Sequence, residues 1–437
     1  MTSGKLLRVL GVGFGLAIIL GSVIGAGIVR TPGEIAQGLP DARLFLGAWV
    51  LGGLYALLGS ASIAELGAMI PRAGGQYAFA HRALGPYAGF IVGWSDWLST
   101  CGTTAAVSIV IGEYSAELVP ALAGREAAIA LFVTVSFALL QWRGLRWGER
   151  TQEVTSLLKA LAFLALIAAC FALGGGHAQT PTPGPPMPQG LALFTALMLA
   201  LQSIIYTYDG WAGLVYFSEE VRDPGRDIPR ATFLGVLAVI AIYVALNGAL
   251  VHVLPIEQIA GNKFAPGLAV SSIFGPRGEQ VLRALLILSM LSAINAYHLM
   301  ATRTLFALSR DGLFARAAER VNPGGTPSVA LFASAAVAAA FLLRTFNQVI
   351  AILAFFFVIN YALSFASVFV LRRREPDAPR PYRAWGYPWT TGLSLLGSVA
   401  FLAGAVVSDR ENTPYALGLL ALSYPVYRLI RRRGRRA

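Results

Sequence analysis

Charged residues are scarce in this 437-residue chain. Asp, Glu, Lys and Arg together make up 13% of it, whereas hydrophobic residues make up 56%. Ordinary soluble domains carry about 25% charged residues, so this composition excludes a water-soluble globular protein. Several apolar runs approach or exceed the roughly 17–25 residues that cross a bilayer as a helix. The sequence therefore predicts a membrane protein with several spans.

The chain also has little cysteine and little histidine. Its two cysteines, Cys101 and Cys170, both fall inside predicted spans, where buried thiols are expected and a disulfide is not. The four histidines are scattered, and the spans contain neither an HExxH motif nor paired aspartates. We therefore expect no enzyme, no metal site and no cofactor. A channel is also disfavoured, because the spans show no repeated charge rings or filter loops.

We predict an all-α membrane protein with twelve transmembrane helices. The expected spans are residues 10–38, 43–69, 86–115, 127–142, 153–173, 190–218, 231–254, 279–306, 327–343, 349–371, 387–408 and 413–430. No soluble domain interrupts them.

The net charge of +12 is distributed unevenly over the two faces that this topology creates. Most of the 34 Lys and Arg residues fall on the face that carries both termini, including the basic tail 431–437. The positive-inside rule assigns that face to the cytoplasm. We therefore expect a protein of the inner (plasma) membrane, with a tail that lies near anionic lipid and does not bind nucleic acid.

A glycine-rich segment interrupts the first span. The sequence GSVIGAGI (residues 21–28) contains three glycines within seven positions, and glycine in a helix interior costs about 1 kcal/mol relative to alanine. Backbone groups freed at membrane depth are tolerated where they line a cavity or meet a partner. This break is therefore predicted to form a binding site.

A second break occurs in the sixth span. It carries Thr207-Tyr208-Asp209-Gly210-Trp211, and an ionisable residue within a span indicates function. The two breaks occupy corresponding positions if spans 1–5 and 6–10 are inverted halves. Paired interruptions of this kind indicate the binding site of a transporter. The alternative is two independently kinked helices.

The chemistry of the two breaks suits a zwitterion. Amides at the start of a half-helix favour a carboxylate, and carbonyls at the end of the preceding half can accept from an ammonium. The expected donors are Gly25, Ala26 and Gly27, and the expected acceptors are the carbonyls of Val23, Ile24, Tyr206, Thr207 and Asp209. An α-amino acid fits both sets.

Three motifs of this chain resemble one known family. They are GSVIGAGI followed by TPGEI, YTYDGW with SEEVRDPGRDIPRA, and NAYHLMATRTLFALSRDGLFARAAERVNPGGTP. Together they resemble the amino acid–polyamine–organocation superfamily, and within it the bacterial members of the L-amino acid transporter family. The resemblance covers at least residues 10–371.

The resemblance implies a LeuT-like fold and alternating access. Two inverted halves of five spans are expected at 1–173 and 190–371, with discontinuous helices 1 and 6. Two further spans follow at 387–430, before the tail 431–437. It also implies the substrate contacts given above, with Tyr206 at the position of an aromatic gate.

Lys159 in the fifth span has more than one interpretation. A lysine near an interface often extends its amine to the membrane surface. The resemblance implies instead an amine that stands where sodium-coupled relatives hold a sodium ion beside helix 1. Such a fixed cation would make transport independent of sodium. Desolvation could also let Lys159 exchange a proton, and proton coupling stays open.

Other polar residues in the spans keep open roles. Asp209 either faces the site and favours cationic substrates, or binds helix-terminal amides and contributes only its backbone. Asn295 either contacts the substrate or joins two helices. Arg30 is expected to face solvent, with attraction of anionic substrate as the alternative. The sequence leaves four more without a role: Glu65, Asp96, Glu113 and Arg303.

The expected function is sodium-independent transport of L-amino acids, by exchange of small or medium neutral substrates. The alternatives are a proton- or sodium-coupled symporter and a carrier of cationic amino acids or polyamines. Human members of the family pair with a glycoprotein through a cysteine after the third span. Because residues 116–125 contain none, we expect no disulfide-linked heavy subunit.

Overall fold

The computed structural model describes residues 10–72, 74–143, 148–175, 186–323 and 326–434. Residues 1–9 of the expected first half and 435–437 of the basic tail lie outside them. The described elements, in chain order, are α1 (Val12–Val23), α2 (Ala26–Gly38), α3 (Ala42–Met69), α4 (Gln76–Leu84), α5 (Pro86–Leu118), η1 (Pro120–Leu122), α6 (Glu126–Arg143), α7 (Gly148–Leu173), α8 (Leu191–Tyr208), η2 (Gly213–Glu220), α9 (Pro224–Val253), α10 (Ile256–Ile259), α11 (Ala265–Arg310), η3 (Arg316–Glu319), α12 (Ser328–Phe341), α13 (Phe346–Arg374), α14 (Trp389–Ser408) and α15 (Thr413–Gly434).

The described residues confirm a helical, multi-pass membrane protein. Seven helices are long and apolar enough to cross a membrane, and the bent pair α1 and α2 makes up to eight. Two shorter apolar helices lie at Leu157–Leu173 and Ser328–Phe341. A helix lies in each of the twelve ranges expected from the sequence, while the count of twelve membrane crossings stays a prediction.

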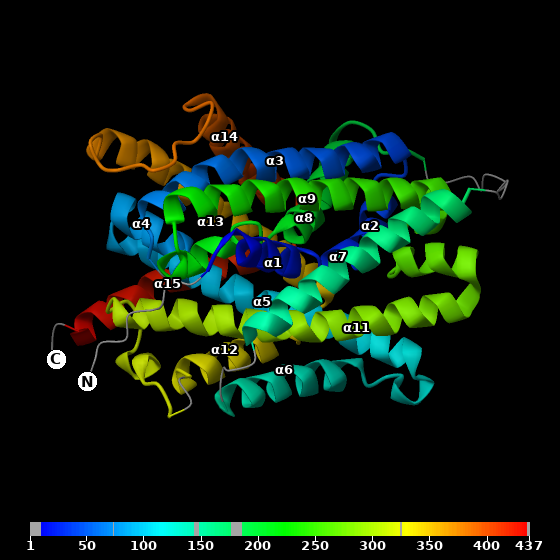
Figure 1. Ribbon diagram of the computed structural model, residues 1–437, viewed down its shortest axis with the longest axis horizontal. Coiled ribbons are helices and arrows are strands. Elements are labelled where there is room, and N and C mark those ends of the chain that lie inside the picture. The colour runs from blue at the N-terminus through cyan, green and yellow to red at the C-terminus, as the bar shows by residue number, and fades with distance from the viewer. Residues whose placement is uncertain (1–9, 73, 144–147, 176–185, 324–325, 435–437) are drawn as a thin grey trace.

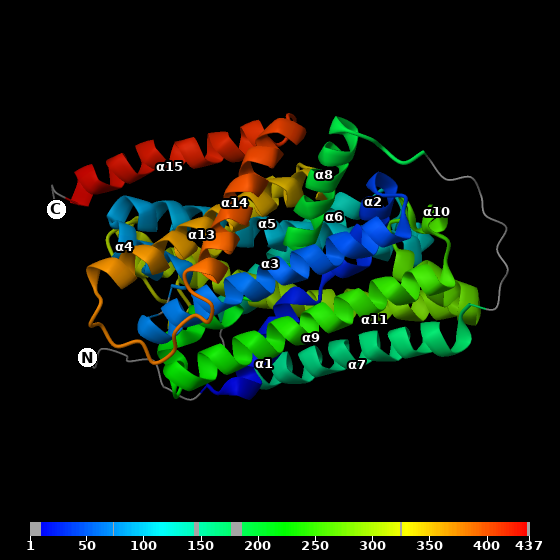
Figure 2. The same ribbon diagram turned by 90° about the horizontal axis from the view of Figure 1, so that it is seen from above.

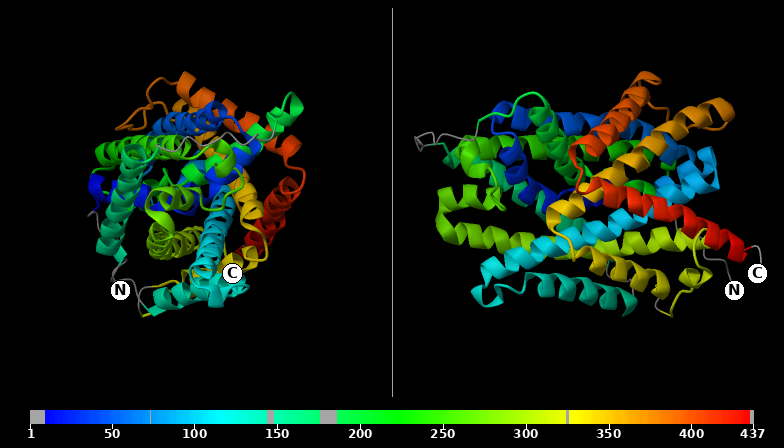
Figure 3. Two further views of the ribbon diagram at one scale, coloured as in Figure 1. Left: turned by 90° about the vertical axis from the view of Figure 1, so that its right-hand side faces the viewer. Right: turned by 180° about the vertical axis from the view of Figure 1, so that it is seen from behind.

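The long helices run side by side along the longest axis of the molecule (Figure 1). Helix α3 packs against α9, and α5 packs against α11 and α13. Seen end-on, the helices form a bundle (Figure 3), and α15 lies along its outside (Figure 2). Helix α1 packs on α7 and α9, and α2 packs on α8. The first break therefore lies inside the bundle.

Local signals in the sequence explain where several helices begin. The Asp41 carboxylate accepts hydrogen bonds from the amides of Arg43 and Leu44 and caps α3. A reciprocal capping box of Thr345 and Gln348 begins α13. Pro86 occupies the first turn of α5, where its missing N–H costs nothing.

Glu65 anchors one of the connections at the end of the molecule where α15 finishes. Its buried carboxylate binds Arg372 at 2.6 and 2.9 Å and lies 3.6 Å from Arg380. It also accepts from the amide of Ala384 at 2.7 Å. These contacts fasten the connection between α13 and α14 to α3. The role that the sequence left open for Glu65 is therefore structural.

Candidate functional site

The first break separates α1 from α2 at Ile24 and Gly25. Gly25 has φ −149° and ψ −145°, so it leaves the helical region, and the two half-helices meet at an angle of 43°. The last carbonyls of α1 and the first amides of α2 consequently lose their partners within the helix. These backbone groups can form a polar site inside an apolar bundle.

Three side chains from three different helices donate to the last carbonyls of α1. Lys159 of α7 lies 3.4 Å from the carbonyl of Gly21. Tyr297 of α11 donates to the carbonyl of Ser22 at 2.7 Å. Tyr243 of α9 donates to the carbonyl of Val23, also at 2.7 Å. The break is thus held open by hydrogen bonds from its surroundings.

The second break follows α8, and it lies against the first. Helix α8 ends at Tyr208, and Gly210 has φ +109°, a conformation that favours glycine. The chain resumes as the 3₁₀ helix η2 rather than as the α-helix expected. The hydroxyl of Ser22 donates to the carbonyl of Ile18 at 2.6 Å and also lies 3.3 Å from the carbonyl of Gly210. A Cβ at Gly210 would come within 2.8 Å of that hydroxyl oxygen, so the approach requires glycine.

Tyr243 also connects the two breaks directly. Its hydroxyl, which donates to Val23, lies 3.1 Å from the carbonyl of Thr207 as well. Nearby, Gly27 approaches Thr207 so closely that a Cβ would lie 2.8 Å from the threonine hydroxyl. Thr31 and Thr207 share a hydrogen bond of 3.0 Å. The two breaks therefore form one continuous polar region.

Part of the expected substrate-binding backbone is unoccupied by protein groups. Within the described part of the chain, no acceptor bonds the amides of Ala26 and Gly27, and no donor reaches the carbonyl of Ile24. The carbonyl of Val23 already accepts from the hydroxyl of Tyr243, which also lies 3.1 Å from the carbonyl of Thr207. Free amide donors and a free carbonyl thus lie within three residues, as a zwitterion requires.

A small polar cavity adjoins both breaks. Its volume is about 30 Å³, which is room for one or two water molecules. Ser22 contributes from the first break, and Asp209 and Gly210 contribute from the second. The rest of its wall is formed by Gln76, Asp96, Thr100, Thr103, Ala212, Gly213, Tyr216, Tyr297, Met300, Phe357 and Asn360.

Two carboxylates face this cavity, and each accepts a tyrosine hydroxyl. Tyr216 donates to Asp96, which is 4% exposed, and Tyr361 donates to Asp209. The hydroxyl of Thr304 lies 3.3 Å from the second oxygen of Asp96. Neither aspartate forms an ion pair with the described residues. The cavity is therefore rich in hydrogen-bond acceptors.

A layer of aromatic and charged side chains covers the other side of the breaks. Tyr206 stands edge-on to Phe346, with ring centroids 5.8 Å apart, and the Arg30 guanidinium lies 5.4 Å from the Phe346 ring. Arg30 also lies 3.5 Å from Glu34 and 3.2 Å from Glu113. Our expectation of a solvent-facing Arg30 was wrong: the residue is 6% exposed. Helix α2 turns this side chain toward α5, which carries Glu113.

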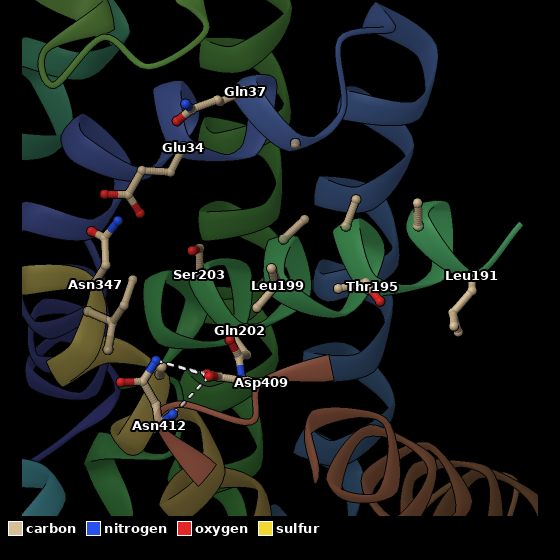
Figure 4. Close-up of a pocket in the computed structure, with 16 residues that line it drawn as sticks. Glu34, Gln37, Leu191, Thr195, Leu199, Gln202, Ser203, Asn347, Asp409 and Asn412 are labelled. Carbon is tan, nitrogen blue, oxygen red and sulfur yellow. Dashed lines mark hydrogen bonds between the residues drawn. The ribbon is translucent and has the colours of Figure 1, made fainter. Parts of the chain in front are cut away.

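A larger hollow of about 710 Å³ lies beyond this layer, between α2, α8, α13 and the junction of α14 with α15. Figure 4 shows Glu34 and Asn347 on one of its walls and Gln202, Asp409 and Asn412 on another. Asp409 accepts from Gln202 and from Asn412, each at 3.2 Å. Ser203, one turn before Thr207, also lines the hollow. The hollow therefore reaches to one helical turn from the second break.

Two other predicted residues lie apart from the small polar cavity. Asn295 accepts a 2.9 Å hydrogen bond from Gln141 of α6, so its contact joins two helices. Lys159 is 5% exposed and does not extend to the surface of the bundle. Sequence reasoning missed Tyr216, Tyr243 and Tyr297, since a tyrosine within an apolar run carries no periodic signal. It singled out Asp96 without a role.

Comparisons with known proteins agree with this geometry. The family model of the amino acid permeases matches residues 15–423. The chain is 28% identical to the serine/threonine exchanger SteT of Bacillus subtilis over 428 residues, which cover 97% of this chain and 96% of that protein. It is 27% identical to the human large neutral amino acids transporter small subunit 2, over 94% of this chain and 78% of that protein. It is 26% identical to the branched-chain amino acid permease BcaP of B. subtilis, over 90% and 88% respectively.

The match of the family model leaves only short terminal segments of the chain outside it. Both breaks, the cavity and the outer aromatic layer lie within the matched residues. The protein belongs to the amino acid permease family, and it is a membrane transporter of amino acids.

Proposed function

We propose that this protein exchanges small or medium neutral L-amino acids across the cytoplasmic membrane, without sodium, by alternating access. The observation that carries the proposal is the pair of apposed helix breaks. Their free amides at Ala26 and Gly27 and free carbonyl at Ile24 complement the two charged groups that every amino acid shares.

The proposed binding mode uses the backbone of the breaks. The substrate carboxylate accepts from the amides of Ala26 and Gly27, at the positive end of α2. The ammonium donates to the carbonyl of Ile24 and to the second lone pairs of the Val23 and Thr207 carbonyls. Gly25 permits the turn between these groups. Tyr206, which contacts Phe346, acts as the gate on the side of the larger hollow.

Sodium independence is proposed from the position of Lys159. Its amine lies 3.4 Å from the carbonyl of Gly21, the third carbonyl from the end of α1, and it is buried. A fixed cation at the negative end of a half-helix is electrostatically favourable. It would stand in for a coupling ion without entering or leaving with the substrate.

We further propose twelve spans in a 5+5 inverted repeat, with both termini in the cytoplasm of an inner membrane. The paired breaks in the first and sixth ranges support this arrangement. We also propose that the transporter acts without a disulfide-linked heavy subunit. Residues 116–125 offer no cysteine, and the described cysteines, Cys101 and Cys170, are free and buried.

One observation supports a second candidate, a carrier of cationic amino acids or polyamines. Asp96 and Asp209 face one cavity, and two buried carboxylates attract positive charge. This candidate predicts that lysine, arginine or putrescine competes best for uptake.

The test is uptake into proteoliposomes that contain only the purified protein. Labelled serine, leucine or lysine is supplied outside, with or without internal amino acid, sodium and a pH gradient. We expect uptake that requires internal neutral amino acid and is unaffected by sodium. Uptake without internal substrate contradicts exchange, and best uptake of lysine favours the second candidate.

A Lys159→Ala arm tests the proposed role of the lysine in the same vesicles. Without its amine we expect transport to fall at least about tenfold and to be partly restored by sodium. Arg125→Ala is the control, since Arg125 is an exposed cation that lies in neither break. An unchanged rate in Lys159→Ala would refute the role of the fixed cation.

A further inference from the structure

On the basis of the proposed function, we infer that the small polar cavity receives the substrate side chain and selects short side chains that form hydrogen bonds. The geometry points to Asp96 as a specificity-determining residue. Serine and threonine are the substrates that fit this description best, followed by alanine.

The inference starts from the position of the cavity. Ser22 and Gly210 line it, and the hydroxyl of Ser22 lies 3.3 Å from the carbonyl of Gly210, across the two breaks. Residues 24–27 do not themselves line the cavity, but in the proposed binding mode the substrate α-carbon lies near Ser22, two residues before Ile24, and hence near the cavity. The substrate side chain points either into this cavity or toward the Tyr206 layer, where Tyr206 and Phe346 are packed together.

The volume of the cavity restricts the length of the side chain. About 30 Å³ accommodates one or two water molecules, and a hydroxymethyl group is of similar size. The four-carbon chain of lysine with its ammonium does not fit without displacing the wall. The wall is fixed by packed residues, since Ser22, Asp96 and Asn360 are each more than 90% buried.

The chemistry of the wall restricts the polarity of the side chain. Most of its residues are polar, and an aliphatic branch would offer no hydrogen-bond donor to the lone-pair sites of Asp96 that Tyr216 and Thr304 leave unused. Burying a polar group without a hydrogen-bond partner is unfavourable. A site built from hydrogen-bonding groups rejects an analogue that lacks the matching group far more strongly than an apolar pocket rejects an extra methylene.

Asp96 is held in place by its neighbours and keeps capacity to accept. Tyr216 donates to one of its oxygens and Thr304 lies 3.3 Å from the other. The hydroxyl of Thr100 donates to its backbone carbonyl at 2.8 Å. A carboxylate offers about four lone-pair sites, so a substrate hydroxyl can donate to Asp96 without displacing these partners.

Similarity to known transporters does not by itself identify the preferred substrate side chain. One relative is named as a serine/threonine exchanger and another as a branched-chain permease, at 28% and 26% identity. The cavity supplies the distinction, because its walls match a hydroxyl and not a branched alkyl group.

The test measures exchange of serine, threonine, alanine, valine, leucine and lysine by proteoliposomes preloaded with each one. Wild-type protein is expected to exchange serine and threonine at least about tenfold more efficiently than valine or leucine. Asp96→Leu is expected to reduce the ratio of serine to valine exchange by about tenfold. Asp409→Leu is the control for Asp96→Leu, because Asp409 is also buried but lines the larger hollow.

A second variant keeps the inference testable if Asp96→Leu does not fold. Tyr216→Phe removes the hydroxyl that holds Asp96 and should raise the KM for serine several-fold more than the KM for alanine. Preferred exchange of valine, leucine or lysine by the wild type overturns the inference, and so does an unchanged serine-to-valine ratio in both variants. If the protein exchanges amino acids with another order of preference, only this inference is refuted. If it exchanges none of the amino acids, the proposed function itself is refuted.

Discussion

At the scale of single residues, the most informative group is the hydroxyl of Tyr243. It lies 2.7 Å from the carbonyl of Val23 and 3.1 Å from that of Thr207, so one atom connects both breaks. These carbonyls belong to the proposed ammonium site. Tyr243 therefore holds in place the two carbonyls whose second lone pairs are proposed to accept from the substrate ammonium.

We predict that Tyr243→Phe weakens both the fold and the substrate site. The buried carbonyl of Val23 loses its donor, and an unpaired buried polar group costs about 1–3 kcal/mol. Purified protein should show a lower Tm and an increased KM for every amino acid by a similar factor. Tyr114→Phe is the matched control, because its buried hydroxyl donates to the carbonyl of Lys263 at 3.0 Å and lies in neither break.

The control variant distinguishes a loss of fold stability, measured by the Tm, from a loss of substrate binding, measured by KM. Tyr114→Phe should lower the Tm and leave KM unchanged. If both variants change KM equally, the hydroxyl of Tyr243 has no particular role at the breaks.

The residues of the site were predictable to different degrees. Glycine carries its own signal, so both breaks could be located from Gly25, Gly27 and Gly210. Lys159 was detectable because a charge inside an apolar run is rare. Tyr243 was not, because a tyrosine within a span is common and its partner lies 220 positions away. Arg30 was misassigned because the bend that buries it depends on packing.

At the scale of elements, helix α2 contributes both to the proposed substrate site and to the charged layer that covers it. Its first turn provides the proposed carboxylate donors, and Arg30, one turn later, is attached to α5 through Glu113. Lys263, in the connection before α11, lies 3.8 Å from Glu113. Helix α2, the second half of the first span, is therefore attached to α5 by an ion pair.

We predict that the ion pair between Arg30 and Glu113 stabilises the packing of α2 against α5. The side chains of Arg30 and Glu113 are 7% and 20% exposed, and removing one partner of a buried pair costs about 3–5 kcal/mol. Arg30→Met and Glu113→Gln should each lower the Tm and slow exchange. The double variant should lose less than the sum of the two, in a double-mutant cycle.

The pair of Arg283 with Glu117 provides the control for this prediction. It joins α11 to α5 on the same side of the molecule but contacts neither break. Arg283→Met should lower the Tm while exchange per folded molecule stays at the wild-type rate. Additive losses at Arg30 and Glu113 would show that their ion pair does not act as a unit.

At the scale of the whole molecule, both ends of the site are closed in this structure. On one side Arg30, Glu34, Tyr206 and Phe346 are packed together. On the other, the chain before α1 is bound to the end of η2, where Leu10 and Glu220 are joined by a 3.0 Å backbone hydrogen bond. Alternating access requires these two closures to open one at a time.

The overall fold was more predictable than its packing. Hydropathy and glycine placed a helix in every expected range, because span length is a local property of the sequence. Which helices touch was not predictable, since the contact of α2 with α8 joins segments more than 150 residues apart. Helix α5 carries Asp96, Glu113 and Glu117 and falls outside the seven apolar spans, although it packs at the centre of the bundle.

The last prediction concerns how the bundle is oriented and how often it crosses the membrane. With Cys101 and Cys170 replaced by serine, single cysteines are placed at the exposed positions Ala123, Arg222 and Asp377. Twelve spans with cytoplasmic termini put position 123 outside and positions 222 and 377 inside. An impermeant maleimide should therefore label Ala123→Cys in intact cells, and label the other two only after permeabilisation. Labelling of Arg222→Cys in intact cells would mean that α7 does not cross the membrane, and labelling of Asp377→Cys alone would mean the same for α12.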